Sequence, residues 1–124
     1  RVLFRSDSVL VSHAIVRQWD AQHPMTLSPA GIGRLRRRLP ETLLITDDMQ
    51  MQGLQKALGT SAASLRAIAA GMDMICIGNN LFDQEQAMAG IAAAVAGAVQ
   101  DGSLDQTAVR QSIARVQQRK ALLA

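Results

Sequence analysis

The sequence predicts an α/β fold in which parallel strands alternate with helices. Three short apolar runs recur at about the spacing of strand–helix–strand units, and segments with helical periodicity lie between and after them. Crossovers of this kind join parallel strands through right-handed connections. The runs are "SVLVSH" (8–13), "TLLITDD" (42–48) and "MDMICIGNN" (72–80).

The three apolar runs have the composition of strands that are buried on both faces. They are short, rich in Val, Ile and Leu, and show no regular alternation with polar residues. Each run ends in polar residues, which are His13, the pair Asp47 and Asp48, and the pair Asn79 and Asn80.

Four further segments have the apolar spacing of helices, at 28–39, 61–71, 83–102 and about 105–123. Ser28 is expected to cap the first helix, with Pro29 at its first position. Ser61 is expected to cap the second helix, and Gly71 to end it.

The size and composition of the chain indicate one partial domain. Its 124 residues are 48% hydrophobic and 19% charged, which suits a folded domain. Three parallel strands, however, leave two apolar edges unpaired. We therefore expect the chain to be the last part of a larger unit that associates with itself or packs against the remainder.

Charge and cysteine content exclude several kinds of site. A net charge of +3 permits an acidic partner without requiring one. The single cysteine, Cys76, is expected in the core and rules out an internal disulfide or a multi-cysteine zinc site. The basic run at 34–38 is interpreted as a solvated helix face rather than a nucleic-acid surface, because no aromatic residues accompany it. No apolar run reaches the roughly 18 residues of a membrane span.

The polar residues at the strand ends are the candidate site. Ligands of α/β sheets and barrels bind where the carboxyl ends of the strands meet. Because side chains alternate along a regular strand, one of Asp47 and Asp48 should face the site and the other should hold the following turn. Both acids could instead be an ordinary helix cap. His13 could be a structural histidine, and Asn79 and Asn80 could form a turn.

Several stretches resemble the bacterial β-N-acetylglucosaminidase branch of glycoside hydrolase family 3. They are "VLVSHA", "HPMTLSP", "LRRRL", "LLITDDMQM", "AIAAGMDMICIGNN" and "GSLDQTAVRQSIARVQQRK", in the family's order. The resemblance implies that residues 1–124 are a single partial domain, the C-terminal part of a TIM-type (β/α)₈ barrel with about three strands. Between the helix that contains "LRRRL" and the next strand, the family usually has a connection of the Gly-Phe-x-Gly type. In this chain Pro40, Glu41 and Thr42 stand there, and the connection is one residue shorter.

The resemblance also implies retaining hydrolysis of β-linked N-acetylglucosamine, as in cell-wall muropeptides, without a metal or organic cofactor. Asp47 corresponds to the nucleophile, Asp48 to a supporting residue and His13 to a residue that lines the sugar pocket. The family's His–Asp acid/base pair and its sugar-binding Lys-His pair do not occur in these residues, so the isolated chain is expected to be inactive.

The expected partners are a carbohydrate and a further part of the barrel, with neither nucleic acid nor membrane. One alternative is a non-catalytic sugar-binding or assembly module derived from the same barrel. A weaker alternative is a Mg²⁺ site on Asp47 and Asp48. We expect a bacterial cytoplasmic protein. Export stays open as well, because the chain begins with Arg1 rather than Met and its natural start is expected upstream.

Overall fold

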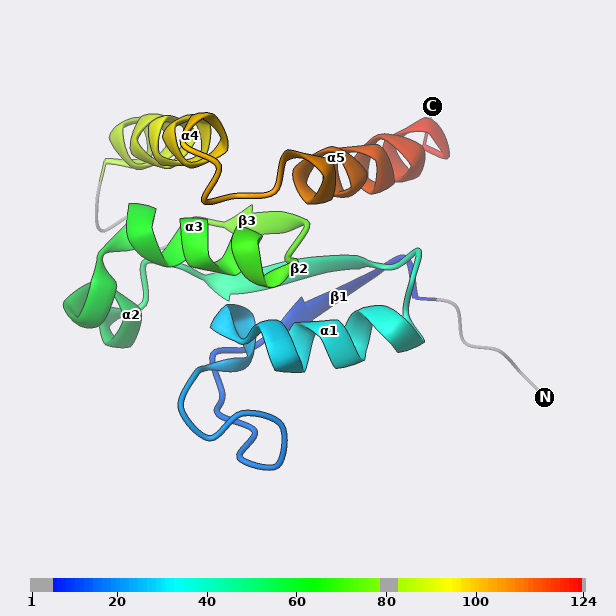
Figure 1. Cartoon of the computed structure of the whole chain (residues 1–124), viewed down its shortest axis with the longest axis horizontal. Coiled ribbons are helices and arrows are strands. Elements are labelled where there is room, and N and C mark those ends of the chain that lie inside the picture. The colour runs from blue at the N-terminus through cyan, green and yellow to red at the C-terminus, as the bar shows by residue number, and fades with distance from the viewer. Residues whose placement is uncertain (1–5, 79–82, 124) are drawn as a thin grey trace.

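A computed structural model describes residues 6–78 and 83–123 of the chain. Strands and helices alternate along the first part, and two longer helices follow (Figure 1). The elements in chain order are β1 (Ser8–Val11), the 3₁₀ helix η1 (Met25–Leu27), α1 (Pro29–Arg38), β2 (Leu43–Asp48), α2 (Gln52–Leu58), α3 (Thr60–Ala70), β3 (Met74–Cys76), α4 (Gln84–Gln100) and α5 (Gln106–Ala121).

The sheet is parallel, with the strand order β1-β2-β3. β1 and β2 pair in register from Ser8 opposite Leu43 to Val11 opposite Thr46. All three strands point the same way, so their carboxyl ends lie together near α2 (Figure 1). The predicted α/β fold with parallel strands is therefore confirmed. The described residues form a three-stranded sheet and do not close a barrel.

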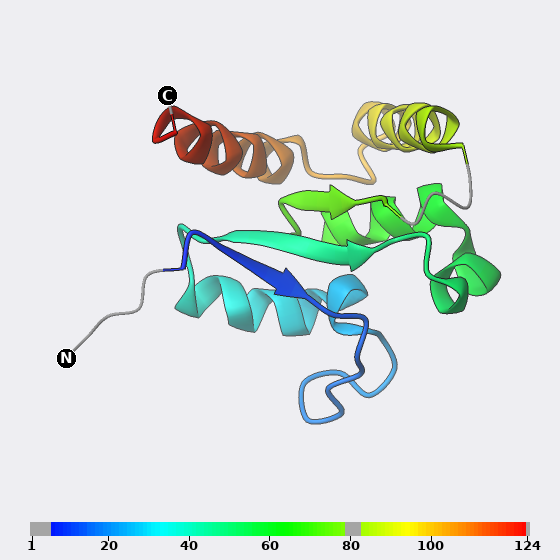
Figure 2. The same cartoon turned by 180° about the vertical axis from the view of Figure 1, so that it is seen from behind.

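Helices cover one face of this sheet. The core lies between the strands and α1 and α3, and the fully buried side chains of Ile32, Leu44 and Ala67 pack there. Seen from behind, the strands face the viewer with no helix of the described residues in front of them (Figure 2). On this second face Leu10 is 62% exposed and Met74 is 38% exposed. The strands are thus buried on one face only within the described residues, so the prediction that both faces are buried is wrong for this chain.

The first helix begins where the sequence predicts. The side chain of Ser28 accepts a hydrogen bond from the Gly31 N–H at 3.0 Å, and Pro29 is the first helical residue. Gly71 ends α3 in the left-handed conformation, with φ of 107°. The prediction for Ser61 is wrong, because α3 already begins at Thr60 and its N-cap makes no side-chain hydrogen bond.

Two short elements were not predicted. The 3₁₀ helix η1 is fully buried, and it interrupts the long connection between β1 and α1. The helix α2 has no side-chain cap and is only seven residues long, so a sequence pattern has little to indicate it. Together these elements bring buried side chains against the ends of the strands, where the candidate site lies.

Asp73, just before β3, ties together segments that are far apart in the sequence. Its side chain is fully buried and accepts hydrogen bonds from the Leu44 N–H at 2.9 Å and the Ser112 hydroxyl at 2.7 Å. The guanidinium groups of Arg36 and Arg115 also bind it. Burial alone would raise the pKa of Asp73, but these four partners outweigh it and hold the pKa below its ordinary value.

Arg36 and Cys76 lie differently from what the sequence suggested. Arg36 belongs to the basic run, yet it turns toward Asp73 and also donates to the Thr42 carbonyl at 2.8 Å. The interpretation of the whole run as a solvated face is therefore wrong for this residue. Cys76 is half-buried rather than fully buried, since it belongs to the short edge strand β3.

A candidate active site at the strand ends

His13 links the ends of the first two strands. It follows β1 directly, and its Nε2 atom donates to the Asp48 carbonyl at 3.0 Å because a carbonyl oxygen can only accept. Its Nδ1 atom then accepts from the hydroxyl of the buried Thr26 at 2.7 Å in the neutral ring. Both ring nitrogens are therefore engaged by the protein itself. His13 is held as a fixed, half-buried wall of the site.

β2 is irregular at the acidic pair. Ile45 pairs with Met74 and Asp48 pairs with Cys76, so three steps along β2 match two along β3. Beside this irregularity the Cys76 N–H donates to the hydroxyl of Thr46 at 2.9 Å. Such a bulge bends a strand and changes where its side chains point. The simple alternation assumed from the sequence therefore does not apply to the last residues of β2.

The two acids make different contacts. Oδ1 of Asp48 accepts from the Gln50 N–H at 2.9 Å and from the Gly78 N–H at 3.3 Å, so it joins the turn after β2 to the segment after β3. Oδ1 of Asp47 accepts from the Asp48 N–H, at 2.9 Å. Within residues 6–78 and 83–123, Oδ2 of Asp47 has no hydrogen-bond partner, and its side chain is half-buried. One carboxylate is thus occupied by the turn, and the other keeps an oxygen available.

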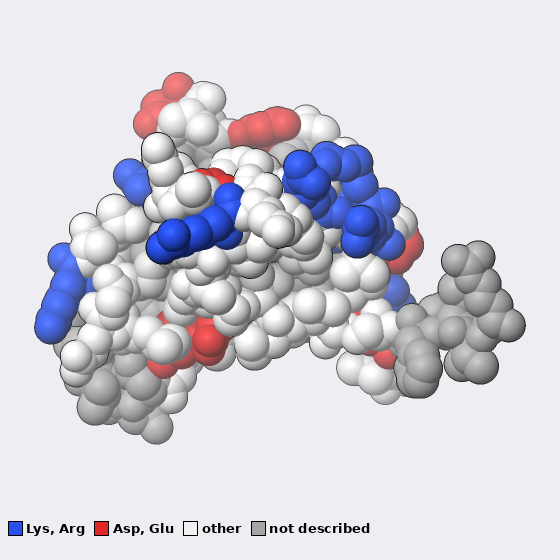
Figure 3. Space-filling model, turned by 90° about the horizontal axis from the view of Figure 1, so that it is seen from below, with Lys and Arg blue, Asp and Glu red and all other residues white. Residues whose placement is uncertain are grey.

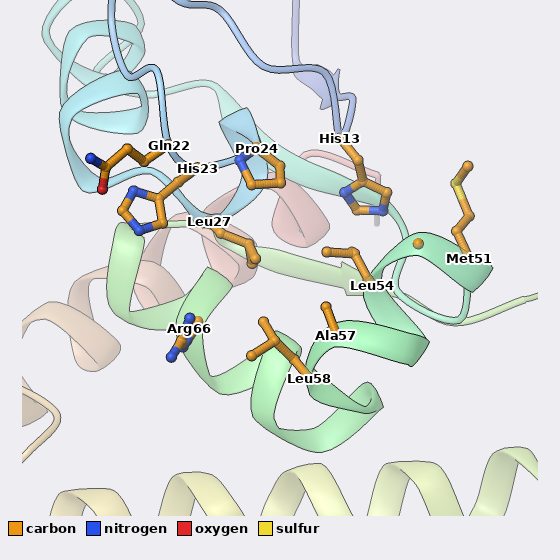
Figure 4. A pocket seen from close by; sticks show the side chains of 11 residues that line it. His13, Gln22, His23, Pro24, Leu27, Met51, Leu54, Ala57, Leu58 and Arg66 are labelled. Atoms are coloured by element: carbon orange, nitrogen blue, oxygen red, sulfur yellow. The ribbon is translucent and has the colours of Figure 1, made fainter.

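A cavity of about 380 Å³ opens beside the strand ends, between the β1–α1 connection and the helices α2 and α3. His13 and Met51 lie at one end of it, and Gln22, His23 and Arg66 lie at the other (Figure 4). The walls between are mostly apolar and come from Pro24, Leu27, Leu54, Ala57 and Leu58. Neither acid of the strand end lines this cavity, so the two features meet only at His13.

Some of the predicted site lies elsewhere or is not described. Asn79 and Asn80 fall outside the described residues. Among the residues that the structure does describe, no group of three or more His, Cys, Asp or Glu side chains is placed to hold a metal ion. None of the described helices is long and apolar enough to cross a membrane.

Thr26, Thr46 and Gly78 contribute to the site but were not singled out from the sequence. Each acts through a contact with a residue of another element, which the sequence pattern does not reveal. Thr26 lies in the stretch "HPMTLSP" and Thr46 lies in "LLITDDMQM". The family resemblance therefore includes both residues but does not predict what they bind.

Comparison with known proteins identifies the family of this chain. The sequence model for the glycosyl hydrolase family 3 N terminal domain matches residues 4–119. The chain belongs to glycosyl hydrolase family 3. No curated protein matched the chain. The resemblance inferred from the stretches around His13 and Asp47 is therefore confirmed at the level of the family.

Solved structures of family members have the same fold as this chain. A fungal multi-domain family 3 β-N-acetylglucosaminidase aligns with a TM-score of 0.82 and 30% identity over 93% of the chain. The β-N-acetylglucosaminidase from Paenibacillus sp. str. FPU-7 aligns with a TM-score of 0.82 and 25% identity over 95% of it. The β-N-acetylhexosaminidase from Beutenbergia cavernae aligns with a TM-score of 0.79 and 26% identity over 94% of it.

The chain spans only part of each of these relatives. It covers 13% of the fungal protein, 23% of the Paenibacillus protein and 34% of the Beutenbergia protein. The three-stranded sheet thus corresponds to a portion of the family's N terminal domain, consistent with part of a TIM-type barrel.

Proposed function

We propose that this chain supplies the nucleophile of a retaining glycosidase that acts on β-linked N-acetylglucosamine. Family membership supports glycoside hydrolysis, and the aligned relatives named as β-N-acetylglucosaminidases support the sugar. The assignment of the nucleophile rests on the different contacts that Asp47 and Asp48 make at the end of β2. Asp48 is bound into the turn, whereas Asp47 keeps a carboxylate oxygen without a partner among the described residues.

The reaction follows from an available carboxylate on a rigid strand end. An oxygen of Asp47 attacks the anomeric carbon of the sugar, and the bond from that carbon to the leaving oxygen breaks. Water then cleaves the resulting glycosyl ester, and the configuration at the anomeric carbon is retained. The hydrogen bond from the Asp48 N–H to Oδ1 fixes the direction in which the second oxygen points.

Asp48 and His13 position the nucleophile rather than react. Asp48 holds the turn after β2 through the Gln50 N–H, and His13 holds the carbonyl of Asp48. A change at either residue would move the end of the strand that carries Asp47. His13 is also the point where the strand end meets the adjoining cavity, so it lines the space next to the reacting sugar.

Full turnover requires an acid/base group about 5 to 5.5 Å from the nucleophile. The family's His–Asp pair does not occur in these 124 residues. We therefore propose that the chain works together with the remaining part of a barrel, which supplies this group. As separate proposals, the complete enzyme acts in the bacterial cytoplasm, and its substrates are fragments of the cell wall. The isolated chain should not hydrolyse an aryl β-N-acetylglucosaminide, because proton transfer is worth roughly 10² to 10⁴ in rate.

The alternative is a module that binds sugar or a partner chain without catalysis. For the isolated 124 residues, the absence of the acid/base pair favours this alternative. The two functions differ in one respect that can be measured, since a binding module forms no covalent bond to the sugar.

Trapping the covalent intermediate tests the proposal. The gene product that contains these residues is incubated with a 5-fluoro-N-acetyl-β-glucosaminide that carries 2,4-dinitrophenolate, a leaving group that departs without an acid catalyst. Peptide mass spectrometry should then find the sugar on Asp47, and the Asp47→Asn variant should carry none. Labelling of Asp48 would reverse the assignment. If no peptide is labelled although the sugar binds, the non-catalytic alternative holds.

A further inference from the structure

The basic run on α1 divides into one arginine that the fold uses and three that it does not. Arg36 binds Asp73, as described above. Arg34, Arg37 and Arg38 are exposed, and none of the ion pairs within residues 6–78 and 83–123 involves them. Three guanidinium groups within five residues repel one another, so their unpaired arrangement calls for an explanation.

These three arginines surround a hollow together with Trp19. The hollow measures about 270 Å³ and is lined by Trp19, Arg34, Arg37 and Arg38. The guanidinium carbon of Arg34 lies 6.0 Å from the centre of the Trp19 ring, and this cation–π contact restrains its side chain. Trp19 itself packs against the core and provides a fixed wall. Viewed from below, the largest group of Lys and Arg side chains lies toward one side of the molecule, and smaller separate groups lie elsewhere on this face (Figure 3).

The acidic residue nearest in sequence to Trp19 does not neutralise this group. Asp20 accepts hydrogen bonds from the Gln22 N–H, the Ser28 hydroxyl and His23, and these hold the pKa of its carboxyl well below its ordinary value. The Asp20 carboxylate therefore binds groups of the segment before α1 and forms no ion pair with the three arginines in the described part of the chain. The three arginines remain available to an external anion.

A favourable interaction with the helix dipole explains only part of this arrangement. Cations near the carboxyl end of a helix are stabilising, and Arg37 and Arg38 lie in the last turn of α1. That effect requires neither the hollow nor Trp19. It also does not account for Arg34, which lies in the middle of the helix.

We propose that this hollow binds a small phosphate-bearing ligand with two or three negative charges. Three guanidinium groups match the charge of a phosphate monoester or a diphosphate better than that of one carboxylate. The planar fork of arginine also suits bidentate binding of phosphate oxygens. The volume of the hollow lies just below the usual range for ligand cavities, which fits a ligand of this size.

This phosphate site is separate from the proposed glycosidase site. Arg37 and Arg38 lie at the end of α1 that leads into the start of β2, whereas Asp47 lies at the other end of that strand. The proposal therefore does not depend on glycosidase activity.

Trp19 is the only tryptophan in the chain, so its fluorescence reports directly on the hollow. The purified chain is titrated with inorganic pyrophosphate, inorganic phosphate and, separately, a short single-stranded oligonucleotide at low ionic strength. The variants are the double change Arg37→Gln with Arg38→Gln, the single change Arg37→Lys, and the control Arg110→Gln. Arg110 is an exposed arginine on α5, so the control removes, at a place away from the hollow, the same charge as each of the two changes in the double variant.

We expect a saturable change in Trp19 fluorescence with pyrophosphate, and a dissociation constant that rises about tenfold or more in the double variant. Arg37→Lys should weaken binding less than the double change, because it keeps the charge but loses the fork. Arg110→Gln should leave binding unchanged. Circular dichroism should show the same folding in all chains, since Arg37 and Arg38 are exposed and unpaired.

Three results would overturn the phosphate site. The first is an absence of saturable binding below about 10 mM pyrophosphate, which is too weak for a specific site. The second is an equal loss in the double variant and in Arg110→Gln, which would indicate non-specific attraction. The third is an oligonucleotide that binds more tightly than pyrophosphate through the same arginines, which would make this a nucleic-acid surface.

Discussion

Replacing Asp73 with Asn should destabilise the chain by about 3 kcal/mol. Removing one partner of a buried ion pair costs about 3 to 5 kcal/mol, because the remaining charge is left unpaired. Arg36 and Arg115 are 22% and 19% exposed, so water can partly solvate them once the carboxylate is gone. Asn also keeps one oxygen that can accept from the Leu44 N–H. Both facts place the loss at the lower end of the range.

Unfolding in urea and by heat, followed by circular dichroism, measures this loss. For a domain of this size, about 3 kcal/mol corresponds to a decrease of roughly 12 °C in Tm. The control is Glu41→Gln, which changes an exposed carboxylate in the same chemical way and should stay within about 0.5 kcal/mol. If Asp73→Asn were no more destabilising than this control, the buried cluster would not hold β3, α1 and α5 together.

The pH dependence of the same pair of proteins gives an independent check. The pKa of Asp73 is lower in the folded chain than its ordinary value, so its contribution to stability is present above about pH 4. That contribution is lost as the pH falls through the folded-state pKa. The difference in unfolding free energy between the wild type and Asp73→Asn should therefore shrink in acid. A difference that grows in acid would contradict the direction of the shift.

Four further changes test the packing of the site, the helices and the sheet. Gly31→Ala should cost about 1 to 3 kcal/mol, because the new methyl group would lie 2.6 Å from a methionine sulfur. Gly97→Ala in α4 meets nothing within 4 Å and should stabilise by up to about 1 kcal/mol; equal effects at the two glycines would refute the argument. Thr46→Val should cost about 1 kcal/mol in urea unfolding by removing the hydroxyl that accepts from the Cys76 N–H, and a loss near zero would mean that this hydrogen bond does not stabilise the fold. The chain should self-associate through its helix-free sheet face, and Leu10→Lys should raise the monomer fraction in light scattering; a monomeric wild type would contradict this.

The sequence predicts best what depends on neighbouring residues. Ser28 before Pro29 specifies a helix start locally, and Gly71 specifies a helix end because it tolerates positive φ. The apolar runs around Val9 and Leu44 likewise specify strands through their composition. These features need no knowledge of the rest of the fold, and the structure reproduces them.

Features set by distant partners could not be predicted in this way. The bulge in β2 arises from the pairing of Asp48 with Cys76, and the hydroxyl of Thr46 becomes important only because of it. Arg36 has the same sequence surroundings as its basic neighbours, and only Asp73, far along the chain, distinguishes it. The sequence predicts that the acidic pair lies at the end of a strand, which the structure confirms. The different hydrogen bonds of Asp47 and Asp48 depend on the folded chain and could not be predicted.

The relative activity of two variants tests the central claim most directly. In the gene product that contains these residues, kcat/KM for an aryl β-N-acetylglucosaminide is measured for Asp47→Asn and Asp48→Asn, with thermal melts as the folding control. We predict that Asp47→Asn lowers kcat/KM by about 10⁴-fold or more while the protein stays folded. Asp48→Asn should reduce activity much less, because Asn can still accept from the Gln50 N–H. If Asp48→Asn is the inactive variant, or if both variants keep their activity, Asp47 is not the nucleophile.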